Sequence, residues 1–178
     1  MTGSGPGPGP EHAGTQAEPE ERGPAIGRGP RLVVAAGLVW LGSQLLVQRR
    51  SKTARHGAGA LELPGGKLER GEGPRAALAR ELGEEWGPQA TELTIGSVAD
   101  VLHHVYPSPG PEVILIVLRV DARAWSGQRW RERIEPEPGV EVVAFELDEL
   151  PLDEFLAADR PFMAAVRDGR VAAWMGQC

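Results

Sequence analysis

Three glutamates at helical spacing are the residues in this sequence best suited to chemistry. Glu81, Glu84 and Glu85 occupy positions i, i+3 and i+4, so a helix would project all three carboxylates from one face. Like charges at this spacing destabilise a helix by about 0.2–0.5 kcal/mol per pair, so a purely structural helix gains nothing from them. A divalent cation would remove that penalty. Mg²⁺ suits such a site because it takes oxygen ligands and pairs a few carboxylates with substrate phosphates.

The residues before these glutamates favour the same chemistry. Gly65 and Gly66 follow Pro64, and glycines let the backbone turn sharply and approach a ligand closely, which leaves carbonyl oxygens free to bind a cation. Arg80 adjoins the glutamates, and Glu72 in the preceding loop is its natural partner. A Glu72–Arg80 pair would hold the loop against the helix. Most glutamate-rich stretches are solvated helix faces, but the glycine turn and this charged pair at fixed spacing argue against that interpretation here.

Residues 66–88 resemble the Nudix box, Gly-x5-Glu-x7-Arg-Glu-U-x-Glu-Glu-x-Gly-U, in which U is a bulky aliphatic residue. Only the last position departs from the pattern, because Pro88 stands where an aliphatic residue is expected. That departure affects packing behind the helix and leaves the carboxylates in place. The matching residues are Gly66, Glu72, Arg80, Glu81, Leu82, Glu84, Glu85 and Gly87.

The resemblance implies a Nudix fold, of the α/β (α+β) class, in which a mixed β-sheet is sandwiched between helices. It also implies hydrolysis of a nucleoside diphosphate linked to another moiety, with Mg²⁺ or Mn²⁺ as cofactor. Glu81, Glu84 and Glu85 would be metal ligands, helped by the Gly65 carbonyl, and Arg80 would belong to the same catalytic group. In this interpretation the metal lowers the pKa of an attacking water and neutralises developing charge.

One glutamate outside the box often completes the metal site or activates water in this family. The resemblance to MutT-like members, in a Glu-Pro-x-Pro-Gly run before a strand, favours Glu135 as a further catalytic and metal-binding residue. Glu137 and Glu141 are close competitors. Either Glu81 or Glu135, if free of metal, would accept the proton from the attacking water.

The residues expected to contact substrate are more widely scattered. Residues 61–72 resemble the corresponding run of MutT-type nucleotide-sanitising enzymes, and Asp159 resembles the Asn or Asp that recognises the base there. The alternative for Asp159 is that it caps a helix starting near Pro161. Arg49 and Arg50 end a predicted strand and would either reach phosphates or the base, or lie exposed as strand-end arginines often do. The predicted substrate-binding residues are Arg49, Arg50, Gly66, Lys67 and Asp159.

The function expected on this basis is that of a MutT-like nucleoside triphosphate diphosphatase, which converts 8-oxo-dGTP or another (d)NTP to a nucleoside monophosphate and diphosphate. ADP-ribose or dinucleoside polyphosphates are alternative substrates, and Tyr106 has the spacing from the box seen in some dinucleoside-polyphosphate hydrolases. A nucleotide-sensing domain without turnover is a further alternative. It usually lacks box glutamates, and all of them are present here.

Composition limits the remaining classes. The net charge of −6 gives no basic footprint for polymeric nucleic acid, so a small-molecule nucleotide is the expected partner. Residues 1–30 contain fourteen Gly or Pro residues and are predicted to be a disordered tail, followed by a Nudix domain over 31–178. The single cysteine, Cys178, the lack of a secretory signal and the short apolar runs predict a soluble cytoplasmic protein, with no membrane partner, as monomer or homodimer.

Helix and strand patterns identify the elements that must position these residues. Pro74 suits a first helical turn and Gly87-Pro88 ends a run of good helix formers, which predicts a helix over 75–86 with Trp86 in the core. Strands are predicted at 32–41, 44–50, 93–105, 113–120 and 140–146, a break at 64–66, and further helices at 153–158 and 161–168. This order favours an α/β or α+β sandwich over repeated βαβ units.

Overall fold

The longest apolar run of the sequence forms the central strand of a mixed sheet. The computed structural model describes residues 1, 3, 29–127 and 130–171. In it, β1 (Arg31–Leu41) turns at Gly42, whose φ of 64° suits glycine, into the antiparallel β2 (Gln44–Arg49). On its other side β1 runs parallel to β6 (Glu112–Asp121), so the sheet is mixed.

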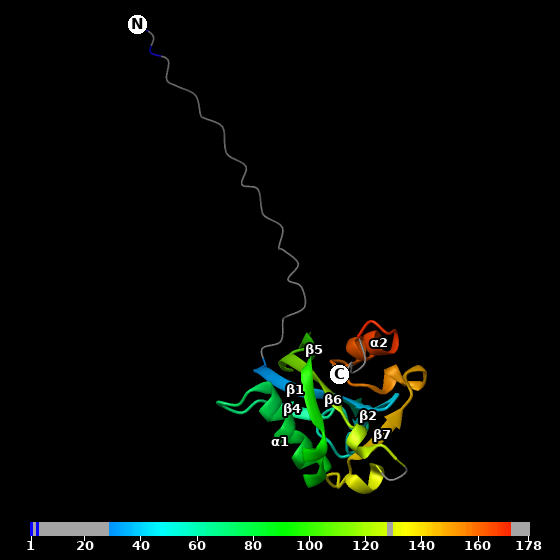
Figure 1. Cartoon of the computed structure of the whole chain (residues 1–178). Coiled ribbons are helices and arrows are strands. Elements are labelled where there is room, and N and C mark those ends of the chain that lie inside the picture. Colours follow the sequence, from blue (N-terminus) through cyan, green and yellow to red (C-terminus); the bar gives the residue numbers. More distant parts are fainter. Residues whose placement is uncertain (2, 4–28, 128–129, 172–178) are drawn as a thin grey trace.

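The described residues form a seven-stranded sheet in the order β3-β2-β1-β6-β5 (Figure 1). β4 pairs with β1 and β7 pairs with β2. The remaining strands are β3 (Leu61–Glu62), β4 (Gly65–Lys67), β5 (Thr94–Val105) and β7 (Glu141–Phe145). Short 3₁₀ turns connect them at η1 (Pro88–Glu92), η2 (Arg123–Trp125), η3 (Trp130–Arg133), η4 (Leu147–Glu149) and η5 (Leu152–Glu154).

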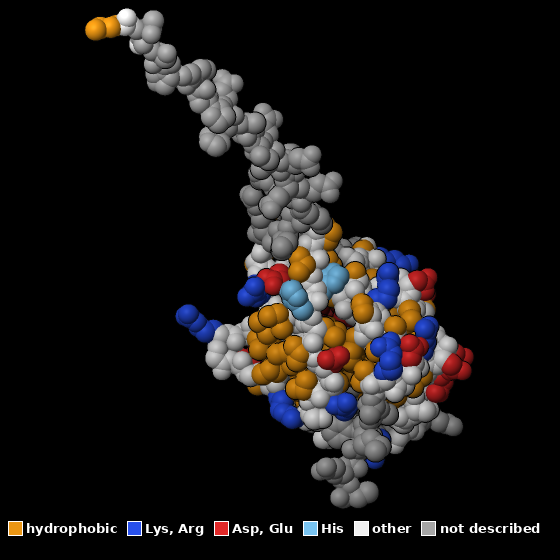
Figure 2. Space-filling view, turned by 90° about the horizontal axis from the view of Figure 1, so that it is seen from above, with side chains coloured by type: hydrophobic (Ala, Val, Ile, Leu, Met, Phe, Trp, Pro, Cys, Tyr) orange, Lys and Arg blue, Asp and Glu red, His pale blue; other side chains and the backbone are white. Residues whose placement is uncertain are grey.

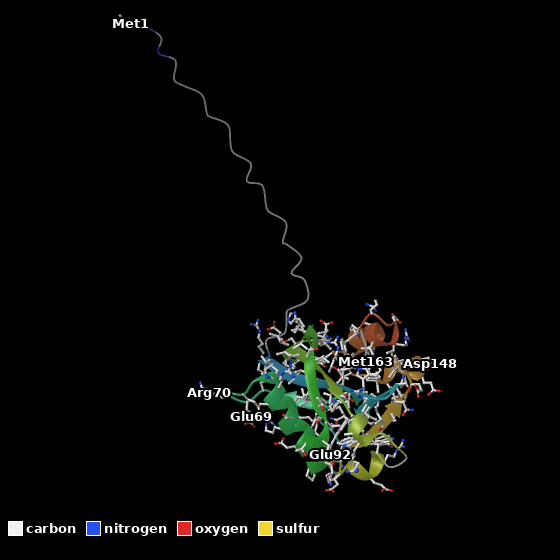
Figure 3. All side chains as sticks on the ribbon, in the orientation of Figure 1. Met1, Glu69, Arg70, Glu92, Asp148 and Met163 are labelled. Atoms are coloured by element: carbon white, nitrogen blue, oxygen red, sulfur yellow. The ribbon has the colours of Figure 1, made fainter. Side chains whose placement is uncertain are left out.

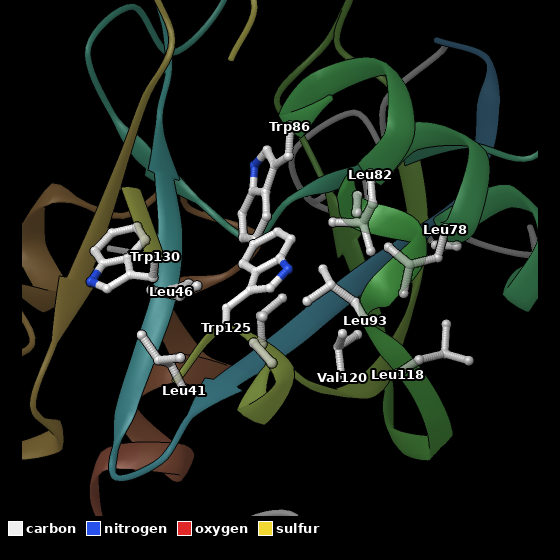
Figure 4. Packing of buried hydrophobic residues seen from close by; sticks show 14 of the residues in the cluster. Leu41, Leu46, Leu78, Leu82, Trp86, Leu93, Leu118, Val120, Trp125 and Trp130 are labelled. Atoms are coloured by element: carbon white, nitrogen blue, oxygen red, sulfur yellow. The ribbon is translucent and has the colours of Figure 1, made fainter. Parts of the chain in front are cut away.

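Two helices cover the two faces of the sheet, and each completes its own core. α1 (Pro74–Trp86) contributes Leu78, Leu82 and Trp86 to one core, where the rings of Trp86 and Trp125 lie 6.2 Å apart (Figure 4). α2 (Arg160–Arg167) contributes Phe162, Met163 and Val166 to the other. The predicted sandwich is therefore confirmed, and so is the placement of Trp86 in the core, where it is fully buried.

One local prediction was only partly right, and another was wrong. The predicted break at 64–66 is partly a strand, because β4 pairs Gly66 with Ala35 and Gly65 with Ala36 of β1. The predicted helix over 153–158 is limited to the short turn η5, and the chain is extended at Phe155. Phe155 is buried in the α2-side core and bridges to Leu61, so tertiary packing overrides the local helix preference.

Several predictions fall on parts of the chain that the structure does not test. The predicted tail lies outside the described residues except at 1, 3, 29 and 30, and Cys178 lies outside them as well. Among the residues that are described, no helix is long and apolar enough to cross a membrane. Large apolar side chains exposed in the folded part are Val33 on β1 and Val98, Val101 and Val105 on β5. Figure 2 shows hydrophobic side chains gathered on one face of the molecule.

Candidate active site

The acidic face of α1 is fixed by the residues on the opposite side of the helix. Leu78, Leu82 and Trp86 recur at intervals of four residues and are all buried, so the intervening glutamates must face away from the core. Pro74 starts the helix, and Gly87 ends it with a φ of 94°. The prediction that one helix carries Glu81, Glu84 and Glu85 on the side away from the core is therefore confirmed.

Arg80 is the electrostatic centre of this acidic face. Its guanidinium donates to Glu72 at 3.0 and 3.1 Å, to Glu81 at 2.9 Å and to Glu84 at 3.1 Å. The predicted Glu72–Arg80 pair is therefore confirmed, and Arg80 lowers the pKa of Glu72. Glu72 also accepts from the backbone N–H of Glu69, which ties down the loop that projects beside α1 in Figure 3.

The two glycines before this loop are needed for different reasons. Gly65 has a φ of 138°, and a Cβ there would lie 2.1 Å from the Ala35 carbonyl oxygen, so only glycine fits beside β1. At Gly66 the conflict is with the site itself, because a Cβ would lie 2.3 Å from the carboxyl group of Glu81. The glycine pair thus brings the backbone of β4 directly against the acidic face of α1.

Glu85 is held at both carboxylate oxygens by uncharged donors. One oxygen accepts from the Gly65 N–H at 2.9 Å, and the other accepts from the side-chain amide of Gln48 at 2.9 Å. The pKa of Glu85 is raised to about 7, mainly by burial and in smaller part by the charges of Glu62 and Glu81, against the opposing effect of the two hydrogen bonds. A cation bound here would offset the cost of ionising this carboxyl group.

Glu62 and Gln48 are site residues that sequence reasoning missed. They face each other across the β2–β3 ladder, and the Gln48 amide donates to Glu62 at 3.2 Å. Burial raises the pKa of Glu62, an effect that its 2.6 Å ion pair with Arg50 opposes. A polar residue at the end of the apolar run Leu45–Val47 was the available signal for Gln48.

Asp159 lies in a second buried group of polar residues. It is 5% exposed, and its carboxylate accepts from the backbone N–H of Leu63 at 3.2 Å. It occupies the position before α2, but its side chain makes no capping hydrogen bond, so the alternative of a helix-capping role was wrong. The pKa of Asp159 is raised to about 7, mainly by burial and in smaller part by the charge of Glu62, while the Leu63 hydrogen bond and the charge of Arg50 oppose the shift.

Tyr106 belongs to the same buried group. Burial raises the pKa of its hydroxyl, the nearby charge of Asp159 adds to the effect, and a hydrogen bond with the Ala158 backbone opposes it. The Leu63 N–H thus donates to Asp159, and the charges of Glu62 and Arg50 act on both Asp159 and Tyr106. We call this group the polar pocket.

The other predicted site residues are placed less centrally. Arg49 pairs with Glu154 at 2.7 Å and donates to the Gly59 carbonyl, whereas Arg50 joins Glu62. The Lys67 side chain is exposed, and its carbonyl accepts from Arg80 at 3.1 Å. Arg50 is thus the arginine of the predicted pair that reaches the polar pocket.

A backbone hydrogen bond holds Glu135 next to the C-terminal end of α1. Its N–H donates to the Trp86 carbonyl at 2.9 Å, and the N–H of Glu137 donates to the Glu85 carbonyl at 3.2 Å. The side chain of Glu135 is exposed, and no hydrogen bond or ion pair joins it to the α1 glutamates within the described part of the chain. Glu141 lies on β7, paired with Arg49 of β2. The choice among these three glutamates stays a prediction.

The α1 glutamates form a donor set of the right chemistry for a hard cation. They supply carboxylate oxygens close to the carbonyl-bearing backbone of Gly65 and Gly66, which is what Mg²⁺ prefers. In the described residues no three acidic, histidine or cysteine side chains converge closely enough to hold an ion as they stand. Glu81 and Glu84 are turned toward Arg80 instead.

Comparison with known proteins identifies the family. The model of the NUDIX domain matches residues 31–166. The 8-oxo-dGTP diphosphatase of Escherichia coli is 28% identical over 138 residues, which cover 77% of this chain and 97% of that protein. A putative 8-oxo-dGTP diphosphatase 2 of Mycobacterium tuberculosis is 47% identical over 64 residues, and that match spans 45% of its length and 36% of this chain.

An RNA pyrophosphohydrolase of Agrobacterium fabrum is 31% identical over 150 residues, which cover 78% of this chain and 84% of that protein. Among solved structures, the MutT protein of Methanosarcina mazei has the same fold, with a TM-score of 0.64 at 23% identity over 80% of this chain and 96% of that one. The family match covers the β-sheet, α1 with its acidic face, and nearly all of α2. The chain belongs to the Nudix hydrolase family and resembles its MutT-like members.

Proposed function

We propose that this chain is a Mg²⁺-dependent nucleoside triphosphate diphosphatase, with Mn²⁺ as an alternative metal. The observation that carries the proposal is the contact between the acidic face of α1 and the polar pocket, made through Gln48. Its amide touches both Glu85 of α1 and Glu62 of the pocket. Phosphate chemistry and nucleoside recognition would therefore take place at adjoining sites, as cleavage of a nucleoside triphosphate requires.

Different residues of the chain would have different roles in this reaction. Glu81, Glu84, Glu85 and the Gly65 carbonyl would hold the metal, which when bound supplies charge neutralisation at the phosphates and acidifies a water molecule. The water oxygen forms the new bond to phosphorus, and the bridging oxygen leaves with the other phosphate group. Glu81 or Glu135 would accept the proton of that water. Arg80 orients Glu72, Glu81 and Glu84 by its hydrogen bonds.

Asp159 would select the base. It is buried, and one of its carboxyl oxygens accepts from the Leu63 N–H, so its other oxygen is the one that would meet the edge of a purine. A raised pKa of about 7 lets this carboxyl act as either a hydrogen-bond donor or an acceptor near neutral pH. The names of the relatives favour an oxidised purine, 8-oxo-dGTP, as the leading candidate.

Other nucleotide substrates remain direct competitors. ADP-ribose, dinucleoside polyphosphates and 5′-triphosphate RNA all carry the diphosphate linkage, and the last is suggested by the relatives named RNA pyrophosphohydrolase. The net charge of −6 is a reason to prefer a free nucleotide over an RNA chain. A sensor domain without turnover is less well supported because every box glutamate is present.

The test is to measure hydrolysis of a panel of nucleotides by chromatographic separation of the products, with Mg²⁺ and with the metal removed by a chelator. The panel contains 8-oxo-dGTP, the ordinary (d)NTPs, ADP-ribose, a dinucleoside polyphosphate and 5′-triphosphate RNA. We expect metal-dependent hydrolysis with 8-oxo-dGTP among the best substrates. Absence of turnover on every substrate would refute the enzymatic proposal, and a clear preference for RNA or ADP-ribose would refute the assigned substrate class.

A further inference from the structure

Gln48 is the buried polar side chain that joins the two halves of the site. It is 1% exposed, on β2, and its amide contacts three other side chains. The nitrogen donates to Glu85 at 2.9 Å and to Glu62 at 3.2 Å, and the oxygen accepts from the indole N–H of Trp86 at 2.8 Å.

Trp86 determines which way this amide faces. An indole nitrogen is a donor only, so the oxygen of the Gln48 amide must face it. The NH₂ group must then face the two carboxylates, which accept its two hydrogens. Trp86 is fully buried among the α1-side core residues and has little freedom to move. The core of the protein thus sets the orientation of a donor aimed at the acidic site.

A neutral amide has a specific advantage at this position. Lysine or arginine here would form an ion pair with the carboxylates, as Arg80 does with Glu81 and Glu84, and would repel a metal ion. The Gln48 amide orients Glu85 while leaving its negative charge available. Each Glu85 oxygen accepts one hydrogen bond, from Gln48 or from Gly65, and retains a further lone pair for a cation.

We propose that Gln48 is a positioning residue that orients Glu85 for cation binding, and that it couples occupancy of the site to Trp86. This inference rests on the proposed function, because it assumes that Glu85 binds the metal. Hydrogen-bond partners of metal ligands typically change metal affinity about 10–100-fold when they are removed. A cation bound to Glu85 would also alter the hydrogen bonds of the Gln48 amide and hence the environment of the Trp86 indole.

The first test compares Mn²⁺ affinity in Gln48→Met and Val47→Ala, measured from the electron paramagnetic resonance signal of free Mn²⁺. Methionine keeps a similar side-chain volume and removes the amide. Val47 is fully buried in the α2-side core, so Val47→Ala is a control for general destabilisation. We expect Gln48→Met to bind Mn²⁺ about 10–100-fold more weakly and Val47→Ala to bind like the wild type. Equal affinity in folded Gln48→Met and wild type would overturn the proposal.

Trp86→Phe provides a second variant in case Gln48→Met does not fold. It removes the N–H that fixes the amide and leaves Gln48 in place, so we expect about fivefold weaker Mn²⁺ binding, the equivalent of one ordinary hydrogen bond. In addition, Mg²⁺ should change the tryptophan fluorescence of the wild type, and Trp86→Phe should abolish that change. Unaltered affinity in Trp86→Phe, or a Mg²⁺ signal of full size in this variant, would contradict the coupling.

Wild-type behaviour separates the two proposals. If the wild type binds no Mn²⁺ and hydrolyses no nucleotide, the proposed function fails and the role of Gln48 fails with it. If the wild type binds Mn²⁺ and turns over nucleotides while the Gln48 and Trp86 variants bind Mn²⁺ with wild-type affinity, only the inference about Gln48 fails.

Discussion

The acidic face of α1 and the polar pocket hold most of their carboxyl groups in different ways. Arg80 of α1 donates to Glu72, Glu81 and Glu84, and these side chains lie within 20 residues of one another. In the pocket, Asp159 and Glu62 come from separate elements, and burial raises the pKa of both. Arg80 thus pairs with three carboxylates of the first region, whereas the second region buries its carboxyl groups; Glu85 of α1 resembles the second region, because burial raises its pKa to about 7.

This difference indicates a division of roles. Charged carboxylates on a helix face are suited to metal and phosphate, whose interactions are electrostatic and do not discriminate among bases. A buried carboxyl group is suited to reading a base edge, because a mismatched ligand would leave the oxygen that does not accept from Leu63 without a partner. The α1 face should therefore control the rate of reaction, and the pocket should control the choice of nucleotide.

The largest expected effect is on the α1 face. Glu84→Gln/Glu85→Gln should lower kcat/KM for diphosphate release by at least about 10³-fold, since loss of metal charge stabilisation costs several kcal/mol. Affinity for a nucleotide without metal should change little, because the pocket is untouched. Activity is measured by diphosphate release and binding by calorimetry. Glu149→Gln alters an exposed glutamate on η4 and serves as the control. Full activity in the double variant would contradict the proposal that the α1 face binds the metal.

The second prediction concerns the pH dependence of stability that the pocket imposes. Asp159 has a pKa of about 7 in the folded chain against about 3.9 when unfolded. The folded state therefore holds the proton longer, and this group's contribution to the free energy of unfolding falls as pH rises from about 4 to about 7. Asp159→Asn removes the titration and can still accept from the Leu63 N–H. Its stability relative to wild type should rise by on the order of 2 to 4 kcal/mol from pH 4 to pH 8.

Urea unfolding of both proteins at a series of pH values measures this difference. Glu85 titrates in the same sense but is present in both proteins, so it cancels in the comparison. Asp148→Asn, at an exposed position on η4, should leave the pH dependence unchanged. The same Asp159→Asn protein should alter the relative activity on 8-oxo-dGTP and dGTP. An equal loss of activity on substrates with different bases, with no change in the pH dependence of stability, would contradict the proposed role of the polar pocket in base selection.

The same contrast explains how much the sequence could predict. Glu72, Arg80 and the α1 glutamates are held together by helical spacing and one short loop, so their arrangement could be predicted from local rules. The partner of Asp159 is 96 residues away in the sequence, and Gln48 meets Glu62 only through the register of β2 and β3. Those contacts depend on how the sheet is assembled, which no single-residue pattern encodes.

A smaller effect is expected where the loop meets α1. Gly66→Ala would place a Cβ 2.3 Å from the carboxyl carbon of Glu81, so this flexible side chain must move. We expect kcat/KM to fall by about 10–100-fold, equivalent to roughly 1.4–2.7 kcal/mol, with little loss of stability. Base preference should be unchanged because the pocket is not affected. Gly73→Ala is the matched control, since nothing lies within 4 Å of its Cβ position. Equal activity in the two variants would contradict a fixed place for Glu81 in the reaction.

The smallest expected effect tests whether the α1 face depends only on its glutamates. Gly83 lies within α1 between Leu82 and Glu84, and nothing lies within 4 Å of a Cβ added there. Gly83→Ala should therefore raise the free energy of unfolding by about 0.5–1 kcal/mol, because alanine loses less backbone entropy in a helix. Activity should stay within about twofold of wild type because the substitution should not move any site residue.

Gly42→Ala is the comparison that isolates this effect. Gly42 also has no atom within 4 Å of its Cβ position, but its φ of 64° lies in the left-handed region. Alanine there should lower the free energy of unfolding by about 1–2 kcal/mol. Urea denaturation of both variants measures the two changes, which should have opposite signs. If Gly83→Ala instead loses activity while gaining stability, the α1 face needs flexibility at this position, and a rigid display of carboxylates would not be enough to explain its function.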